Sequence, residues 1–221
     1  MSDGMLLLEQ IFSSPSLMLI AGVILGFAIS ILAVFLTYQF RKPSIIMKVV
    51  KGFVRSECGS GTKKSSIGFF QIAVVNIGRS SALDCQIEIT FKDTDGKSIA
   101  ETIVGKWDRG PEPMMDFSNL RFPQPSFVHF SEYANIRPNR SEKFSLFIKV
   151  DGDQECYGFG AANYIEAYHD CFRMPSRRIS HDVFLAEINI IGGRVRRTQT
   201  FLVDNKTAGL DGVKLSRWMQ Y

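Results

Sequence analysis

Hydrophobic residues follow two different patterns along this chain. Residues 17–40 (LMLIAGVILGFAISILAVFLTYQF) form an uninterrupted apolar run without Asp, Glu, Lys, Arg or His. As a helix this run would be about 36 Å long, which is enough to cross a bilayer core with some tilt. A helix also pairs every backbone group inside lipid, so the run predicts a transmembrane helix. Beyond it, apolar and polar residues are mixed, which indicates one soluble domain held at a membrane.

Alternation of apolar and polar residues predicts strands in the rest of the chain. The clearest case is residues 82–92, whose alternate side chains would share one buried face: Leu83, Cys85, Ile87, Ile89 and Phe91. Further strands are predicted at residues 44–54, 67–76, 98–107, 127–130, 142–150, 182–191 and 194–203, the last two forming a hairpin. Residues 161–173 have the composition of a helix. Together these elements predict an all-β fold, an antiparallel immunoglobulin-like β-sandwich with one helical insertion, preceded by a single N-terminal transmembrane helix.

The expected organisation has four parts. Residues 1–15 form a short tail, residues 16–42 the transmembrane helix, residues 43–203 the β-sandwich and residues 204–221 a C-terminal tail. Ser14 is suited to cap the helix and Pro15 to occupy its first position. The acidic N-terminus and the long apolar run differ from a cleaved signal peptide, so we expect an uncleaved anchor.

Charge on the two sides of the apolar run predicts its orientation. No Lys or Arg precedes the run, whereas five follow it within about 15 residues: Arg41, Lys42, Lys48, Lys51 and Arg55. Positive flanks stay in the cytoplasm, so we expect the C-terminal domain there and the membrane in question to be the cell membrane. Two triplets that fit the N-glycosylation pattern, at Asn139 and Asn205, argue for the extracytoplasmic alternative.

Small residues recur every four positions within the apolar run. Gly22, Gly26 and Ser30 would lie along one face of the helix, where small side chains permit close backbone approach. This face either packs against a second helix, from another copy or a partner, or reflects how common Gly and Ser are in membrane helices.

Composition limits the function further. Charged residues make up 22% and aromatic residues 12%, which argues against a disordered tail on an anchor. The net charge of +4 is too small to indicate nucleic-acid binding. Basic residues near the anchor and late in the chain are candidates for contacts with anionic lipid or an acidic partner. Of these, Arg41, Lys42, Arg177, Arg178, Arg196 and Arg197 form the expected set, with Arg173 and Arg194 beside them.

The four cysteines, Cys58, Cys85, Cys156 and Cys171, show no metal-like spacing. A domain this large can fold without disulfides, so we expect mostly buried free thiols. A zinc site would have to use Cys156, His169, Cys171 and His181, whose spacing matches no known pattern. A Cys171–His181 nucleophile pair lacks a recognisable oxyanion element. We therefore expect neither a catalytic site nor a metal or cofactor.

One pair of motifs resembles a known family. The segments VVNIGRSSALDCQIEI and IRPNRSEKFSLFIKV, followed by a closing hairpin, resemble the immunoglobulin-like domains of cell-adhesion-related bacterial and archaeal proteins. Those domains show V-x-N-x-G, a small residue, an alternating strand, and a turn before a second alternating strand. Two departures are Pro138-Asn139, where such domains usually place Gly, and the extra residues 154–181. The resemblance implies a fold and a general binding or scaffolding role, and it assigns no catalytic residue.

The function predicted from these observations is that of a membrane-anchored accessory subunit or scaffold that binds other proteins. Its partners would be membrane lipid and other membrane subunits, or a second copy through the transmembrane helix, and not nucleic acid. The alternative is a membrane-tethered metalloenzyme or hydrolase that uses residues 156–181.

Overall fold

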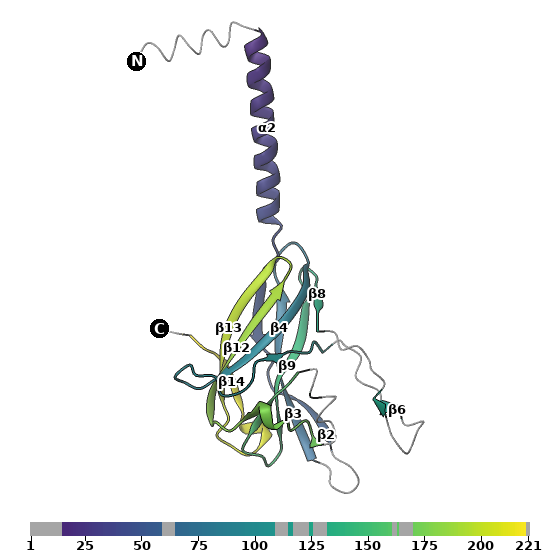
Figure 1. The fold of residues 1–221 in the computed structure, drawn as a ribbon, viewed down its shortest axis with the longest axis vertical. Helices are drawn as coiled ribbons and strands as arrows, with labels where there is room; N and C mark the ends of the chain where they lie inside the picture. Colours follow the sequence, from purple (N-terminus) through teal and green to yellow (C-terminus); the bar gives the residue numbers. More distant parts are fainter. Residues whose placement is uncertain are drawn as a thin grey trace. The chain divides into compact units, whose positions relative to one another are not determined.

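A computed structural model describes residues 15–58, 65–108, 115–116, 124–125, 132–160, 163 and 170–219 (Figure 1). Internal contacts divide the chain into two compact units, Met1–Lys42 and Pro43–Tyr221. The first unit contains the apolar run and the second contains the strands.

The N-terminal unit contains the helix α2, Pro15–Phe40. Among the described residues, α2 is the one helix that is long and apolar enough to cross a membrane, with Met18–Tyr38 as its candidate span. The helix starts at a proline, as expected, and Pro43 lies just beyond its end, where proline prevents further helical turns. The apolar side chains described in α2 are exposed.

The C-terminal unit contains two larger antiparallel sheets, and the first of these is called sheet I. In order across the sheet it contains β1 (Ile45–Val49), β3 (Ser65–Asn76), β9 (Ser141–Val150), β10 (Cys156–Gly158) and β11 (Arg178–Ile179), while β2 (Val54–Cys58) also pairs with β3. The sequence predicted one strand over residues 44–54. Instead, β1 and β2 pair with successive parts of β3, because the chain bends at Gly52, which has a φ of 79° that favours glycine.

The second sheet, called sheet II, contains the alternating segment predicted over residues 82–92 and the final hairpin. In order it contains β14 (Lys214–Arg217), β13 (Val195–Asp204), β12 (Val183–Gly192), β4 (Ala82–Lys92) and β5 (Ile103–Val104), while β8 (Ala134–Ile136) also pairs with β4. The predicted final hairpin is confirmed by the continuous pairing of β12 with β13. The strand predicted over residues 98–107 is only the short β5 with isolated bridges at Ser98 and Trp107.

Shorter elements complete the described chain. A separate two-stranded sheet joins β6 (Met115–Asp116) and β7 (Gln124–Pro125). The described residues include two named 3₁₀ helices, η2 (Pro175–Arg177) and η3 (Leu210–Gly212). The expected C-terminal tail therefore contributes η3 and β14, which pairs with β13. The strand predicted at residues 127–130 and most of the predicted helix over residues 161–173 lie outside the described residues.

The two sheets face each other across a shared apolar core. Phe147 of sheet I packs against Phe184 of sheet II with ring centroids 5.9 Å apart. Buried Trp107 lies across Phe144 at 5.9 Å and donates a hydrogen bond of 2.9 Å from Nε1 to the carbonyl of Cys85. Because both sheets bury apolar side chains in one cluster, each stabilises the other through apolar area removed from water.

The alternation predicted for β4 is correct except at its first position. Cys85 and the alternate residues after it are buried, as expected, but Leu83 is 52% exposed. The register with β8 shifts between Ala82 and Cys85, and Asp84 has a φ of 50°. This irregularity turns Ala82 inward and Leu83 outward, since a one-residue slip exchanges the faces of a strand.

Candidate functional site

Two of the four cysteines form a disulfide. Cys58, at the end of β2, is bonded to Cys171 with a Cα–Cα distance of 5.3 Å. Cys85 and Cys156 are free and buried. The expectation of free thiols is therefore confirmed for Cys85 and Cys156 and is wrong for Cys58 and Cys171. It failed because a sequence separation of 113 residues gives no sign that two cysteines meet in space.

Burial makes the two free thiols unreactive at neutral pH. Loss of solvation raises the pKa of the Cys85 thiol to about 11, with the Asp84 carboxylate adding to the effect. Burial raises the pKa of the Cys156 thiol to about 12, although the Lys149 charge acts in the opposite direction. Nucleophilic attack and metal binding need the thiolate, which these values make scarce at neutral pH.

The residues considered for a zinc or nucleophilic site are not brought together. Cys171 is held in the disulfide, which removes its thiolate as a ligand or nucleophile. Cys156 points into the core, and His181 is exposed on the segment before β12. His169 lies outside the described residues. Within the described ranges, no group of three His, Cys, Asp or Glu side chains is placed to hold a metal ion.

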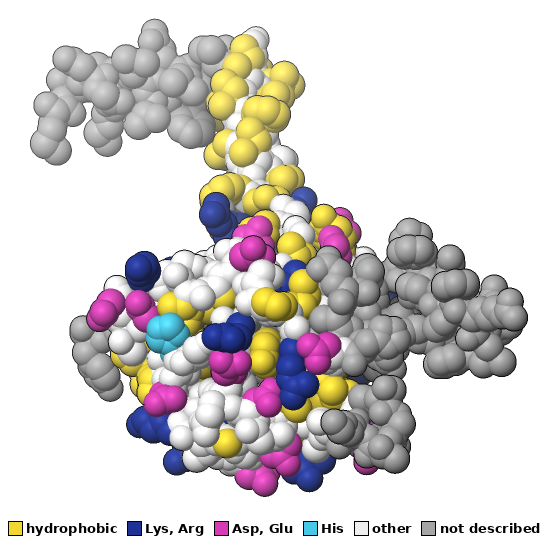
Figure 2. Space-filling view, turned by 60° about the horizontal axis from the view of Figure 1, so that its bottom comes forward, with side chains coloured by type: hydrophobic (Ala, Val, Ile, Leu, Met, Phe, Trp, Pro, Cys, Tyr) yellow, Lys and Arg dark blue, Asp and Glu magenta, His cyan; other side chains and the backbone are white. Residues whose placement is uncertain are grey.

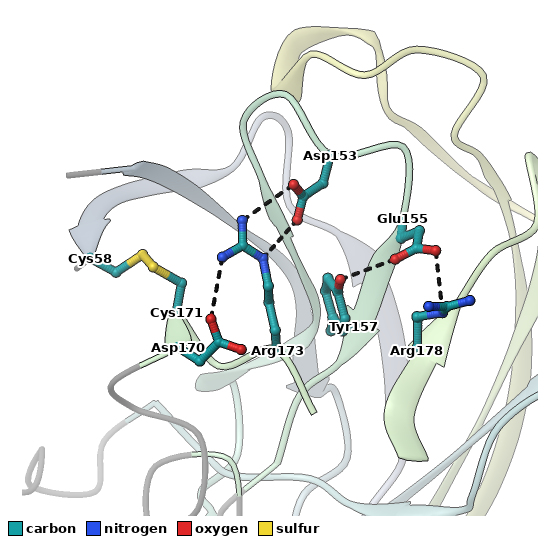
Figure 3. Close-up of polar contacts among 8 residues, drawn as sticks. All are labelled: Cys58, Asp153, Glu155, Tyr157, Asp170, Cys171, Arg173 and Arg178. Carbon is teal, nitrogen blue, oxygen red and sulfur yellow. Dashed lines mark hydrogen bonds and ion pairs between the residues drawn. A yellow bond between two sulfur atoms is a disulfide. The ribbon is translucent and has the colours of Figure 1, made fainter. Parts of the chain in front are cut away.

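Two groups of polar contacts lie beside the disulfide instead (Figure 3), formed by Asp153, Glu155, Tyr157, Asp170, Arg173 and Arg178. Arg173 donates two hydrogen bonds to Asp153, from Nε to Oδ2 at 2.9 Å and from Nη2 to Oδ1 at 3.2 Å. Asp170 lies on the other side of the same guanidinium, with Oδ1 at 3.6 Å from Nη1. These contacts join the turn after β9 to the segment that carries Cys171.

A second, separate group of contacts lies between β10 and β11 (Figure 3). Glu155 accepts a hydrogen bond of 3.1 Å from the Tyr157 hydroxyl and lies 3.2 Å from Nε of Arg178. Burial, followed by the hydrogen bond from Glu155, raises the pKa of Tyr157 to about 12. Beneath these polar groups lies a second apolar cluster formed by Ile67, Ile148, Val150, Tyr157, Phe159, Cys171 and Phe172. We interpret the region as a structural cover for one face of sheet I.

The same segment contains Arg177, which hydrogen-bonds the side-chain oxygen of Asn163. Asn163 is buried and donates from Nδ2 to the carbonyls of Gly158 at 3.2 Å and Phe172 at 3.3 Å. Arg177 and Arg178 therefore bind other parts of the domain, whereas Arg196 and Arg197 are exposed on β13. The basic set expected from sequence is divided between two regions.

A buried lysine connects sheet I to the segment that follows β13. Lys149 is fully buried, and its ammonium donates to the side-chain oxygen of Asn205 and to the carbonyl of Thr207 at 2.6 Å. Burial lowers its pKa. Asn205 also donates to the carbonyl of Gln154 at 2.8 Å, so its amide is enclosed and is not accessible for glycosylation. Asn139, in the exposed β8–β9 turn with a φ of 57°, remains accessible.

The small-residue face of α2 is uncovered at Gly22 and Gly26. Side-chain carbons added at Gly22 or Gly26 would meet no atom within 4 Å. Ser30 donates from Oγ to the Gly26 carbonyl at 2.8 Å, which satisfies its hydroxyl within the helix. At the C-terminal end, the Lys42 ammonium lies 5.8 Å from the ring centroid of Tyr38, and Arg41 is exposed.

A groove of about 380 Å³ is a candidate binding site in the described part of the β domain. It lies between the bend that joins β1 to β2 and the segment from η3 to β14. Its lining includes a paired aromatic wall, Phe53 against Phe70 with ring centroids 5.4 Å apart. Leu210 and Leu215 line the opposite side.

Charged groups are distributed around this apolar lining. Lys51, from the β1–β2 bend, and Lys214, from β14, are exposed lining residues from opposite sides of the groove. Asp211 is the one acidic lining residue. The site therefore combines an apolar surface with an excess of positive charge. The sequence suggested nothing of this groove, because its walls come from segments about 160 residues apart.

Comparison with known proteins adds little to this geometry. No protein-family model matches the chain, and no curated protein matches it in sequence. A solved structure described as the X-ray structure of Northeast Structural Genomics Consortium target SoR45 is 9% identical, with a TM-score of 0.30, and the match covers 74% of this chain and 86% of that chain. Similarity at this level carries no argument about fold or function.

Proposed function

We propose that this chain is a single-pass membrane protein whose immunoglobulin-like β-sandwich binds other proteins, as an accessory subunit or scaffold of a membrane assembly. The groove between the β1–β2 bend and β14 is the observation that carries the proposal. The apolar length of α2 supports the anchor, and two antiparallel sheets around one core support the sandwich. The motif around Asn76 supports a resemblance to adhesion-related domains.

The proposed occupant of the groove is an extended segment of a partner protein with a large apolar side chain between acidic residues. A volume of about 380 Å³ accommodates one or two large side chains, and burying such an anchor is the usual source of binding energy at an interface. Lys51 and Lys214 supply charge that complements acidic residues beside the anchor. Charge complementarity of this kind speeds association and selects partners.

Photocrosslinking tests the proposal in native membranes. A benzophenone amino acid at Leu215, inside the groove, should give a discrete adduct, whereas the same group at exposed Thr198 on β13 should not. Lys51→Glu should abolish the Leu215 adduct because it reverses a lining charge. Lys48→Glu, an exposed position on β1, is the matched control and should leave the adduct intact.

Two outcomes would contradict the proposal. One is an adduct at Leu215 that persists in Lys51→Glu, since the groove would then not determine binding. The other is a protein that purifies in mild detergent as a monomer and gives no adduct at either position.

The proposed location of the β domain is the cytoplasmic face of the cell membrane, on the basis of the basic residues that follow α2. The Cys58–Cys171 disulfide argues for the other face, because cytoplasmic thiols are generally kept reduced. An exposed thiol introduced by Lys97→Cys distinguishes the two. An impermeant maleimide should modify it only after lysis if the domain is cytoplasmic, and modification in intact cells would reverse the orientation.

A further inference from the structure

One end of the β domain carries a concentration of arginines that the sequence does not reveal. Three loops meet there, residues 77–81 between β3 and β4, residues 137–140 between β8 and β9, and residues 192–194 between β12 and β13. We call these residues the basic loop end. They contain Arg79, Arg137, Arg140 and Arg194, all exposed, and no Asp or Glu. The nearest described acidic positions along the chain are Glu142, two residues after Arg140 and buried in β9, and Asp84, three residues after the first loop.

Large apolar side chains are exposed among these arginines. Ile77 is 54% exposed in the first loop, Leu83 is 52% exposed at the start of β4, and Ile191 is 36% exposed beside the third loop. The Gly193 amide donates to the carbonyl of Leu83 at 3.2 Å, which holds the second and third of these positions close together. Apolar tips surrounded by basic residues are typical of surfaces that bind the headgroup region of a membrane.

The side chain of Asn76 fixes the geometry of this end through four hydrogen bonds. The buried amide of Asn76 donates from Nδ2 to the carbonyls of Ser80 at 2.7 Å and Ile136 at 2.9 Å. Its Oδ1 accepts from the backbone amides of Ser44 at 3.2 Å and Gly78 at 3.0 Å. One side chain therefore joins the first loop, the last residue of β8 before the second loop, and the start of the domain.

Chain connectivity limits the distance between the basic loop end and a membrane spanned by α2. Ser44 is four residues after Phe40, the last residue of α2. Four residues extend at most about 14 Å, so a bilayer spanned by α2 would lie within reach of this end. The loops at the opposite ends of the strands are rich in acidic residues instead, namely Asp93, Asp95, Asp151, Asp153 and Asp182. Lys97 and Arg173 also lie among these acidic residues, and Figure 2 shows Lys and Arg side chains interspersed with Asp and Glu on the β domain. An anionic surface would therefore attract the basic loop end more strongly than this acidic end.

We propose that the basic loop end binds anionic phospholipid headgroups. Its arginines pair with lipid phosphates, and Ile77, Leu83 and Ile191 enter the headgroup region. This contact orients the β domain on the membrane, independently of any partner in the groove. It adds Arg79, Arg137 and Arg140 to the lipid contacts expected from sequence, and it excludes Arg177 and Arg178, which are bound elsewhere in the domain.

The test uses the full chain in nanodiscs of neutral phosphatidylcholine, with and without anionic phosphatidylglycerol. The label is the environment-sensitive fluorophore NBD on Ile191→Cys. The buried native thiols, with their raised pKa values, should not compete for it. With phosphatidylglycerol, we expect blue-shifted emission and quenching by spin-labelled lipid, both reversed by high salt. Nanodiscs have the same lipid on both faces, so the outcome does not depend on orientation.

Two controls make the result decisive. The same label on Asp95→Cys, at the acidic end, should respond to neither lipid. Charge reversal by Arg79→Glu with Arg140→Glu should reduce the fraction of labels at position 191 with blue-shifted emission by about tenfold or more. Lys97→Glu at the acidic end should not change this fraction. Emission at position 191 that ignores phosphatidylglycerol, or that changes equally at position 95, would overturn the proposal. A response that survives the double charge reversal would overturn it as well.

Discussion

Replacing Asn76 by alanine should destabilise the β domain more than the same replacement at any exposed asparagine. The side chain is fully buried and makes four hydrogen bonds, two as donor and two as acceptor. The carbonyl of Ile136 lies in the interior, and leaving such a group unpaired costs about 1–3 kcal/mol. The other three partners lie nearer to water, so each lost bond costs roughly 0.5 kcal/mol. The expected total is about 3 kcal/mol.

Thermal unfolding of the full chain in detergent measures this loss. The near-ultraviolet circular dichroism of buried Trp107 reports on the β domain, and about 3 kcal/mol should lower its Tm by about 10 °C. Asn76→Asp should also destabilise it, because a carboxylate keeps the two acceptor roles, loses both donor roles and adds buried charge.

The matched control is Asn135→Ala. Asn135 is exposed and accepts one hydrogen bond of 2.8 Å from the Asp84 amide, so its loss should cost about 0.5 kcal/mol or less. An Asn76→Ala variant that unfolds with the same midpoint as Asn135→Ala would refute the role assigned to Asn76.

Four further predictions follow from other parts of the molecule. Gly26→Ile should weaken self-association or co-purification of partners without preventing membrane insertion, because it adds bulk to the small-residue face of α2. The control Ile31→Leu should change neither property. An unaltered oligomeric state in Gly26→Ile would show that the small-residue face does not mediate association. Cys171→Ser should lower the free energy of unfolding by about 3–5 kcal/mol in non-reducing urea titrations, as expected for a loop of 113 residues, and a loss of the same size in reducing buffer would contradict this cause. The Cys156 thiol, with a pKa near 12, should resist iodoacetamide at neutral pH until the domain unfolds, and rapid modification of the folded protein would be inconsistent with its burial. Folding raises the pKa of Tyr157 from 10.0 to about 12, so the neutral phenol contributes stability below pH 10 that is lost as the pH rises toward 12. The urea midpoint of Tyr157→Phe should therefore fall less at alkaline pH than that of the parent chain.

Strand positions were predictable where local alternation determines them. The final hairpin was found because β12 and β13 alternate around two glycines. The bend at Gly52 was missed because the residues around it have strand propensity, and only pairing with β3 shows the division. The outward position of Leu83 was missed because the irregularity near Asp84 depends on the partner strand β8.

Candidate sites were less predictable because they are assembled from distant segments. Sequence grouped Arg177 and Arg178 with Arg196 and Arg197 by their proximity in the chain, but the first two bind Asn163 and Glu155. The basic loop end takes its arginines from three connections between strands, which no local pattern links. The groove is similar, since its two lysines come from opposite ends of the domain sequence.

The bond between Cys58 and Cys171 would also control how far this chain can be pulled. Tension from an anchored α2 enters the β domain at Ser44 and reaches Cys58 after β1 and β2. While the bond is closed, the 113 residues of its loop cannot lengthen, which removes about 400 Å of extensible chain. Once it is reduced, a domain unfolded by force gains that length. For the proposed anchored binding domain, reduction of this bond would therefore increase the distance that the chain can span between the membrane and a bound partner.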